Sequence, residues 1–322
     1  MLNIYMLTYN RANYIKESIE SILNQTYKDF RLIILNNCST DNTLDVINSI
    51  HDDRITVITH EQNIGAINNG NWPFMNNDEK YFMIIHDDDV YEPEMVETEL
   101  KFMESNPQVA LVSVIGSIID SDGNYKAKRE KRSLEECNKY LYTKGEYFLN
   151  KITKQGKEIY CPTVMWRKEW VDNHKILSRA EAGPACDFVQ YSEVCFAGGT
   201  IAVLDTALFN YREHAGQDSF QNLYNKFDLR EIDTLYKLNE EYKVNIDKSE
   251  FSKYLSYKMA FRAYQIAKHK LGKEQIIKAR KEVEQKEFFL GYTKVDKLII
   301  NLSTMCPWVI RMAARLRDMR GR

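Results

Sequence analysis

The chain has 322 residues, of which 44% are hydrophobic and 12% aromatic, and this is enough for one large domain or two ordinary ones. A formal net charge of −2 argues against a general nucleic-acid-binding protein. The six cysteines form no CxxC pair, so we expect free thiols, not disulfides or a zinc site. The N-terminus has no signal-peptide pattern, and no run of about 18 apolar residues predicts a spanning helix. A cytoplasmic location is therefore expected.

The first half of the chain alternates strand and helix patterns. Short apolar runs predict strands at Leu2–Leu7, Phe30–Leu35, Ile55–Thr59 and Tyr81–Ile85. Apolar residues at helical spacing predict helices at Tyr14–Asn24, Thr43–Ile50 and Ala66–Met75. This alternation is typical of parallel βαβ units in an open sheet, which makes the chain an α/β protein.

A polar cluster directly follows each of three predicted strands. The clusters are Thr8–Arg11, Asn36–Asp41 and His86–Asp89. In open parallel sheets ligands bind beyond the carboxyl ends of the strands. We therefore expect the three clusters to meet in one crevice, although they lie far apart in the sequence.

The third cluster is the most informative, because three adjacent aspartates end an apolar strand. Asp87, Asp88 and Asp89 repel one another and are costly to desolvate, so they indicate a positively charged partner. Hard oxygen ligands suit Mg²⁺ or Mn²⁺, and such a cation usually accompanies a phosphate. The alternative is a loop over Val90–Val96 that enters a helix, whose N-terminus favours acidic residues.

The second half of the chain gives a weaker pattern. It predicts a helix from Pro93 to Asn106, a strand at Val109–Ile119, a turn at Asp120–Asn124, a charged mobile surface loop at Lys126–Lys139 and a strand at Ile201–Leu204. From about Leu223 onward the sequence pattern predicts helices. Asp247–Glu250 resembles a capping box, Gly272 is expected to end the helix that follows it, and Lys273–Phe288 is the next helix.

Taken together, these segments resemble glycosyltransferase family 2 of the bacterial polysaccharide type, on the GT-A fold. The matching segments are Met6–Arg11, Ser21–Phe30, Asn36–Thr43, Asn63–Gly65, His86–Asp89, Asp187 and Tyr211–His214. The resemblance covers residues 2–219. It implies a Rossmann-like, mostly parallel sheet flanked by helices in a catalytic domain at 1–219, followed by a helical C-terminal extension at 220–322.

The resemblance also implies a metal-dependent, inverting transfer of sugar from a nucleotide diphosphate sugar, with a UDP-sugar expected. The donor-binding residues that it implies are Thr8, Tyr9, Asn10, Arg11, Asn36, Ser39, Asp41, Asn63, Gly65, Asp87 and Asp88. It places Mn²⁺ or Mg²⁺ on Asp88, Asp89 and His214, and it makes Asp187 the general base. The acceptor is expected to be a hydroxyl of a glycan or lipid-linked glycan.

Three positions depart from the family pattern. Leu7 stands where a proline is usual, and Asn36 stands where an aspartate bonds the nucleotide base. Together with His86, which often aligns with the first acid of the metal motif, Asn36 motivates a different class of function. In that alternative the chain is a non-catalytic glycan-binding or scaffold protein that retains the fold. A sugar-nucleotide nucleotidyltransferase is disfavoured, because the loop at Thr8–Arg11 has no glycine.

Several residues have an ordinary structural explanation beside the functional one. Asp187 could cap a helix over Phe188–Val194, and His214 could be an ordinary hydrogen-bonded residue. Arg212 could pair with phosphate or with an acidic neighbour. The basic segment Pro307–Arg322 could lie on an anionic membrane at the inner face of the cell, or it could be a packed helix with its arginines in water.

Overall fold

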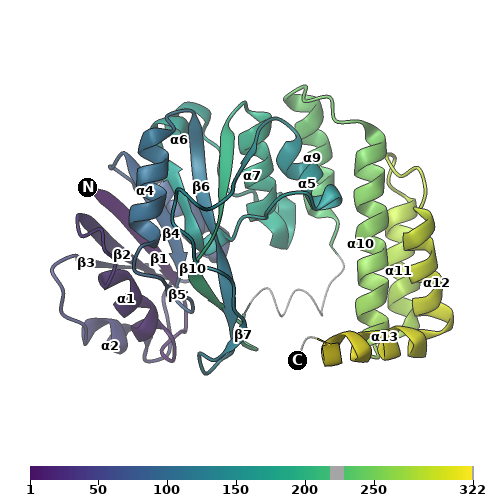
Figure 1. Ribbon diagram of the computed structural model, residues 1–322, viewed down its shortest axis with the longest axis horizontal. Helices are drawn as coiled ribbons and strands as arrows, with labels where there is room; N and C mark the ends of the chain where they lie inside the picture. Colours follow the sequence, from purple (N-terminus) through teal and green to yellow (C-terminus); the bar gives the residue numbers. More distant parts are fainter. Residues whose placement is uncertain (218–227, 321–322) are drawn as a thin grey trace.

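The computed structural model describes residues 1–217 and 228–320, and its centre is a sheet with helices on both faces (Figure 1). In the described part of the chain the sheet has ten strands, with β3-β2-β1-β4-β9-β6-β10-β5 as its main path. The strands are β1 (Leu2–Thr8), β2 (Phe30–Asn36), β3 (Ile55–Thr59), β4 (Tyr81–His86), β5 (Val90–Tyr91), β6 (Val109–Ile119), β7 (Tyr125–Ala127), β8 (Lys139–Tyr142), β9 (Val164–Arg167) and β10 (Thr200–Arg212). The predicted α/β fold is confirmed.

The helices alternate with the strands in the first half and follow one another at the end of the chain. They are α1 (Ile15–Leu23), α2 (Thr43–Asn48), α3 (Ala66–Asn76), α4 (Met95–Ser105), α5 (Glu146–Thr153), α6 (Lys168–His174), α7 (Cys186–Phe196), α9 (Arg230–Glu241), α10 (Lys248–Lys268), α11 (Lys273–Glu284), α12 (Lys294–Met305) and α13 (Pro307–Arg320). Within the described ranges, none of them has the length and apolar character that a membrane crossing requires.

The long strands of the sheet point in one direction. The four strands β3, β2, β1 and β4 pair in parallel. Strand β9 is antiparallel to both β4 and β6, so β4 and β6 run the same way, and β10 is parallel to β6. Thr8 lies opposite Asn36, and Leu7 lies opposite His86. The three polar clusters therefore emerge side by side at one edge of the sheet.

The two faces of the sheet carry separate apolar cores, because successive side chains of a strand point to opposite faces. Ile4 and Met6 of β1 belong to a core that includes Ile19 of α1 and Met95 of α4. Tyr5 belongs to the other core, which also holds residues of α3, α5, α7 and the C-terminal helices. The polar clusters at the carboxyl ends of β1, β2 and β4 belong to neither core.

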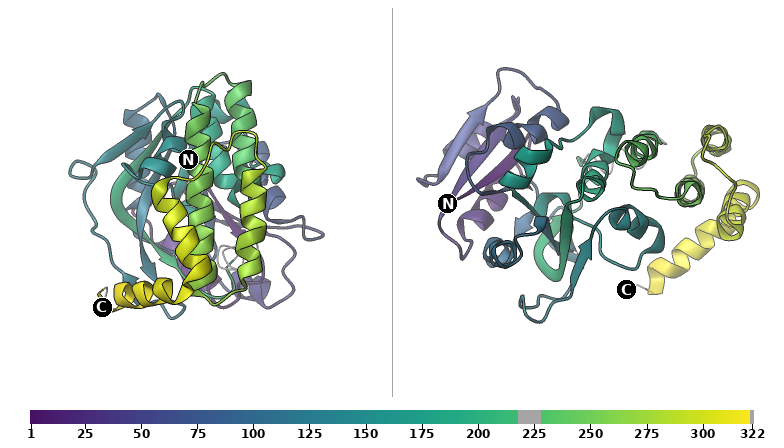
Figure 2. Two further views of the ribbon diagram at one scale, coloured as in Figure 1. Left: turned by 90° about the vertical axis from the view of Figure 1, so that its right-hand side faces the viewer. Right: turned by 90° about the horizontal axis from the view of Figure 1, so that it is seen from above.

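The C-terminal helices share the second of these cores with the sheet. Helix α9 packs on α7, and α10 packs on α5, α11, α12 and α13 (Figure 2). Phe148 of α5 stacks on Phe251 of α10 with ring centroids 4.8 Å apart. The expected division between residues 219 and 220 lies outside the described residues and stays a prediction.

The structure corrects several sequence expectations. Val90 and Tyr91, expected in a loop, form β5 against β10, which a pattern of only two residues could not show. Strand β10 extends far beyond Ile201–Leu204, because bulges beside Leu204 and Ala207 let it continue past polar residues. Gly272 does not end α10 but directly precedes α11. Of the predicted capping box the Asp247 cap is confirmed, since Asp247 accepts a hydrogen bond from the Ser249 amide at 2.7 Å, whereas the Glu250 side chain pairs with Lys253.

We expect Phe251→Ala to lower the free energy of unfolding by about 3–5 kcal/mol, the usual cost of removing a buried phenylalanine. Phe251 is fully buried against Phe148 and Phe288, so urea unfolding should remain a single transition at lower urea. The control is Phe261→Ala on the same helix, where 42% of the residue is exposed, and its cost should be about 0.5 kcal/mol or less. Equal effects of the two variants would contradict the shared core.

Candidate active site

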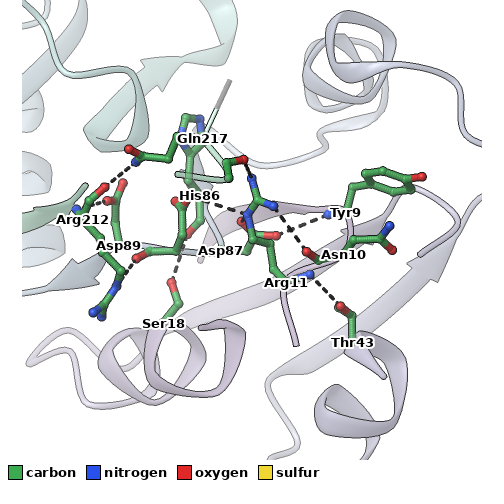
Figure 3. A network of polar contacts seen from close by, with 12 residues as sticks. Tyr9, Asn10, Arg11, Ser18, Thr43, His86, Asp87, Asp89, Arg212 and Gln217 are labelled. Carbon is green, nitrogen blue, oxygen red and sulfur yellow. Dashed lines mark hydrogen bonds and ion pairs between the residues drawn. The ribbon is translucent and has the colours of Figure 1, made fainter. Parts of the chain in front are cut away.

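The first two polar clusters are joined by hydrogen bonds at the ends of β1 and β2. The Asn10 amide donates to Ser39 Oγ at 3.0 Å, and the Arg11 amide donates to Thr43 Oγ1 at 2.8 Å. The Tyr9 amide donates to Asp87 Oδ2 at 3.3 Å, which ties the first cluster to the third (Figure 3). Asn10 has a φ of 53°, so the chain turns sharply there. The three clusters therefore meet at one edge of the sheet, as predicted.

Two of the predicted donor-binding residues have internal partners. Asn36 is buried, accepts from the Ser39 amide at 3.0 Å and donates to Thr59 Oγ1 at 3.3 Å. Asp41 accepts from the amide and the hydroxyl of Thr43 at 3.0 and 2.5 Å. Both side chains shape the loop after β2. The buried Thr8 ends β1, and the next residue, Tyr9, is exposed.

Asn63 and Gly65 form a turn that is attached to the second cluster through Asn37. Asn37 Nδ2 donates to Asn63 Oδ1 at 3.1 Å, and Asn37 Oδ1 accepts from the Ile64 amide at 2.9 Å. Gly65 has a φ of 83°, which strains a residue with a side chain, and its amide donates to Asn63 Oδ1 at 2.8 Å. Gly65 directly precedes α3, and neither residue belongs to the acidic cluster.

The acidic cluster could hold a cation. Each of His86, Asp88 and Asp89 offers a ligand atom, and these atoms lie within 4.8 Å of one another. Asp89 is 0% exposed, and its Oδ2 atom has no hydrogen-bond partner. Burial and the neighbouring charge of Asp88 raise the pKa of Asp89 well above its usual range. An unpartnered buried carboxylate oxygen beside two other ligand atoms fits Mn²⁺ or Mg²⁺.

Arg11 partly neutralises the same loop. Its Nε atom lies 3.6 Å from Asp87 Oδ1 and 3.7 Å from Asp88 Oδ2. Burial, and then repulsion by Asp88, raises the pKa of Asp87 to about 7. Arg11 and the nearby guanidinium of Arg212, which is itself paired with Glu17, do not balance three buried carboxyl groups, so the cluster can accept a further positive charge.

His214 binds Asp88 through its ring. His214 Nε2 lies 2.9 Å from Asp88 Oδ2, and its Nδ1 accepts a hydrogen bond from the Gly216 amide at 3.2 Å. Since Nδ1 accepts, Nε2 carries the proton and donates it to Asp88. In this arrangement His214 orients a carboxylate of the cluster, and direct ligation of a metal by His214 stays a prediction.

Arg212 pairs with acidic residues of the protein, which was one of its two expected environments. Its backbone amide donates to Asp89 Oδ1 at 2.8 Å, and its Nε donates to the Asp88 carbonyl at 2.8 Å. Its Nη2 lies 2.5 Å from Glu17 Oε2, and the guanidinium sits over the Tyr14 ring at 5.0 Å. The buried Arg212 side chain thereby fixes the acidic loop to β10 and α1.

Asp187 lies in the first turn of α7. The helix begins at Cys186, so Asp187 is not the cap of a helix over Phe188–Val194, as the structural alternative had it. Burial raises the pKa of the Asp187 carboxyl, while the Phe188 amide and the charges of Lys151 and His86 oppose the rise. A carboxylate with a raised pKa is a better proton acceptor.

The sequence did not identify the residues that hold the acidic loop from behind. Ser18 donates to the His86 carbonyl at 3.0 Å, and Tyr91 exchanges hydrogen bonds with the His86 backbone at 2.9 and 3.1 Å. Gln217 donates to the Arg212 carbonyl (Figure 3). His86 itself joins the cation cluster, which its place at the head of the three aspartates could have suggested.

The architecture is that of the GT-A glycosyltransferases. TarS 1–349 of S. aureus in complex with UDP-GlcNAc superposes with a TM-score of 0.65 over 98% of this chain and 91% of that chain, at 15% identity. A mannosyltransferase from Pyrobaculum calidifontis in complex with GDP-Man and Mn²⁺ superposes with a TM-score of 0.54 over 98% and 87%, at 12% identity. At these identities the likeness concerns the fold.

The chain belongs to glycosyl transferase family 2, whose model matches residues 3–175. It is 29% identical over 231 residues to an uncharacterized glycosyltransferase of Haemophilus influenzae, covering 70% of this chain and 68% of that protein. It is 34% identical over 125 residues to chondroitin synthase of Pasteurella multocida, covering 38% of this chain but 13% of that protein. Asp187, Arg212 and His214 lie beyond the stretch that the family model matches.

We expect Arg212→Met to lower the free energy of unfolding by about 1.5–3 kcal/mol, because the buried loop carbonyl of Asp88 loses a charged donor. Glu17→Gln is the matched control. It removes only the charge of a partner that is 57% exposed, so its cost should be about 1 kcal/mol or less. Thermal and urea unfolding of both variants measure the two free-energy costs. The reverse order of effects would show that the ion pair, not the carbonyl bond, holds the loop.

Proposed function

We propose that the protein is a metal-dependent, inverting glycosyltransferase that moves a sugar from a nucleotide diphosphate sugar to a hydroxyl of a glycan. The observation that carries this proposal is the pairing of a cation-fitting cluster, His86, Asp88 and Asp89, with a separate aspartate of raised pKa, Asp187. The first could serve the leaving diphosphate and the second the incoming hydroxyl. An inverting transfer needs both a group that neutralises the leaving diphosphate and a base that accepts the proton of the acceptor hydroxyl.

The donor is a nucleotide diphosphate sugar, and we expect uridine as its base. The loop after β1, from Thr8 to Arg11, and the loop from Asn36 to Asp41 form the walls of the proposed nucleotide pocket. The TarS structure contains UDP-GlcNAc, which supports a UDP-sugar, whereas the mannosyltransferase contains GDP-Man. The internal hydrogen bonds of Asn36 leave base selection to the backbone and the exposed residues of these loops.

The chain's own residues divide the reaction into two tasks. Asp88 and Asp89, with His86, would hold Mn²⁺ or Mg²⁺, and the bound cation would neutralise the leaving diphosphate as a Lewis acid. Asp187 would accept the proton of the acceptor hydroxyl. As the hydroxyl oxygen bonds to the anomeric carbon, the bond from that carbon to the diphosphate oxygen breaks, and inversion follows from attack on the opposite face.

The acceptor is a glycan or lipid-linked glycan, and surface polysaccharide synthesis is the process that we propose. The similarity to chondroitin synthase supports a polysaccharide. We place the reaction in the cytoplasm or at the inner face of the cell membrane. The two departures behind the non-catalytic alternative have structural explanations, because Asn36 shapes its own loop and His86 joins the cation cluster. No observation now favours that alternative.

Removing the metal should abolish donor binding. Asp88→Asn keeps the size of the side chain and removes a negative ligand, so we expect the Mn²⁺-dependent affinity for UDP, measured by calorimetry, to fall by about two orders of magnitude. Wild-type protein in EDTA should behave alike, and GDP should bind more weakly than UDP. Asp172→Asn on the exposed side of α6 is the control and should change nothing. Full UDP affinity of the wild type in EDTA would sink the metal assignment.

Asp187→Asn should lower turnover by about 10²–10⁴ while leaving UDP affinity intact, because the amide keeps the shape but cannot accept a proton. In the wild type kcat/KM should rise with pH through the raised pKa of Asp187, since only the ionised form is a base. The Asn variant should lack this limb. Glu181→Gln at an exposed neighbouring position is the control. Loss of UDP affinity together with turnover would make Asp187 a donor ligand.

A further inference from the structure

Helices α12 and α13 present large apolar side chains that the rest of the described chain does not cover. The most exposed of them are Val295 (66%), Leu298 (58%), Met305 (76%), Trp308 (58%) and Met312 (54%). Single exposed apolar residues are ordinary, but here five lie within eighteen positions on two helices that touch each other. We call these five residues the apolar strip.

The strip is the outward face of helices whose inward face is already packed. On α12, Val295, Leu298 and Met305 are separated by three and seven residues, which places them on one side, and Ile300 is buried on the other. On α13, Ile310 and Ala314 face the protein, so Trp308 and Met312 face away. The packed-helix alternative for Pro307–Arg322 therefore accounts for only one face of α13.

The charges beside the strip have one sign. Lys294 and Lys297 flank it on α12, and the exposed Arg315 flanks it on α13. Arg311 is half-buried and donates to the Ala267 carbonyl of α10 at 3.4 Å. Among the described side chains of these two helices the one acid is Asp296, and it accepts from Ser256 Oγ at 2.6 Å and from Thr293 Oγ1 at 2.7 Å. A surface that is apolar in the middle and positive along its margins is complementary to anionic lipid headgroups.

The position of α13 adds a second argument. Strands β4 and β6 point the same way, and β6 leads into β7, so the carboxyl-end edge with the candidate site lies on the β7 side of the molecule. Helix α13 lies across the ends of α10 and α11 on that same side (Figures 1 and 2). A partner surface bound to α13 would therefore lie on the same side of the molecule as the candidate site.

We propose that the apolar strip and its three exposed basic neighbours, Lys294, Lys297 and Arg315, dock the protein onto the anionic surface of a lipid bilayer. Trp308 enters the headgroup region, where tryptophan is favoured, while Arg315 contacts lipid phosphates. The contact is weak and reversible, because a few cations and a shallow apolar face do not anchor a protein permanently. A second copy of this chain is a poorer occupant, since two faces of equal positive charge repel each other.

The test uses the full chain and vesicles of phosphatidylcholine with or without phosphatidylglycerol. We expect flotation only with the anionic vesicles, and loss of binding at high salt, where the screening length falls from about 10 to about 3 Å. Each basic residue near the surface is worth a factor of about five, so Lys297→Gln with Arg315→Gln should weaken partitioning about thirtyfold. Trp308→Ser with Met312→Ser should weaken it comparably.

The matched controls lie on α11, where Ile277 and Lys278 are also exposed. Ile277→Ser and Lys278→Gln should leave flotation unchanged. Brominated lipid should quench the emission of Trp308, and Trp308→Phe should remove this quenching although three other tryptophans remain. UDP affinity in solution should be the same in every variant, so a failure of the donor assignment would not be mistaken for a failure of docking.

Three results would overturn the inference. The first is a wild-type protein that does not float with anionic vesicles at low salt. The second is a loss of flotation in the α11 controls as large as in the strip variants. The third is a dimer in sedimentation experiments that Trp308→Ser dissociates, because the strip would then be covered by a second copy of the chain.

Discussion

Buried negative charge at the end of β4 is the constraint around which the site is arranged. Three carboxyl groups follow a strand with no solvent to screen them, and each is costly unless something positive or hydrogen-bonding meets it. The chain provides Arg11 on one side, His214 on Asp88 and the Arg212 amide on Asp89. The Oδ2 atom of Asp89 has no hydrogen-bond partner and is therefore available as a cation ligand.

The elements that supply these partners are distant in sequence. Arg11 comes from the loop after β1, Arg212 from the end of β10, and Ser18 and Glu17 from α1. They meet because parallel pairing fixes the relative heights of the strands, with Leu7 beside His86 and Thr8 beside Asn36. The chemistry of the loop therefore depends on strand register, and a shift of one residue would turn these side chains to the opposite face.

The sequence predicted the parallel half of the fold well, because each strand there is a continuous apolar run and each helix has a regular period. It predicted neither β9 nor β5, since two to four residues carry no period and their pairing is decided by distant strands. The convergence of the three polar clusters could be predicted from the open-sheet rule. The role of Arg212 could not, because phosphate and a protein acid attract a guanidinium equally. The binding roles of the site residues stay predictions.

The core that α9 to α12 share with the sheet limits how such a chain can diversify. The shared core includes Phe251, Phe148 and Phe288. The C-terminal helices therefore cannot be replaced as an independent domain unless the core residues of the sheet side change as well. Outward-facing positions of the same helices carry no such restriction. Substitutions on the outer surface of these helices could therefore change their binding partner while the inner surface stays the same. A new partner would be acquired by such substitutions, not by recombination of domains.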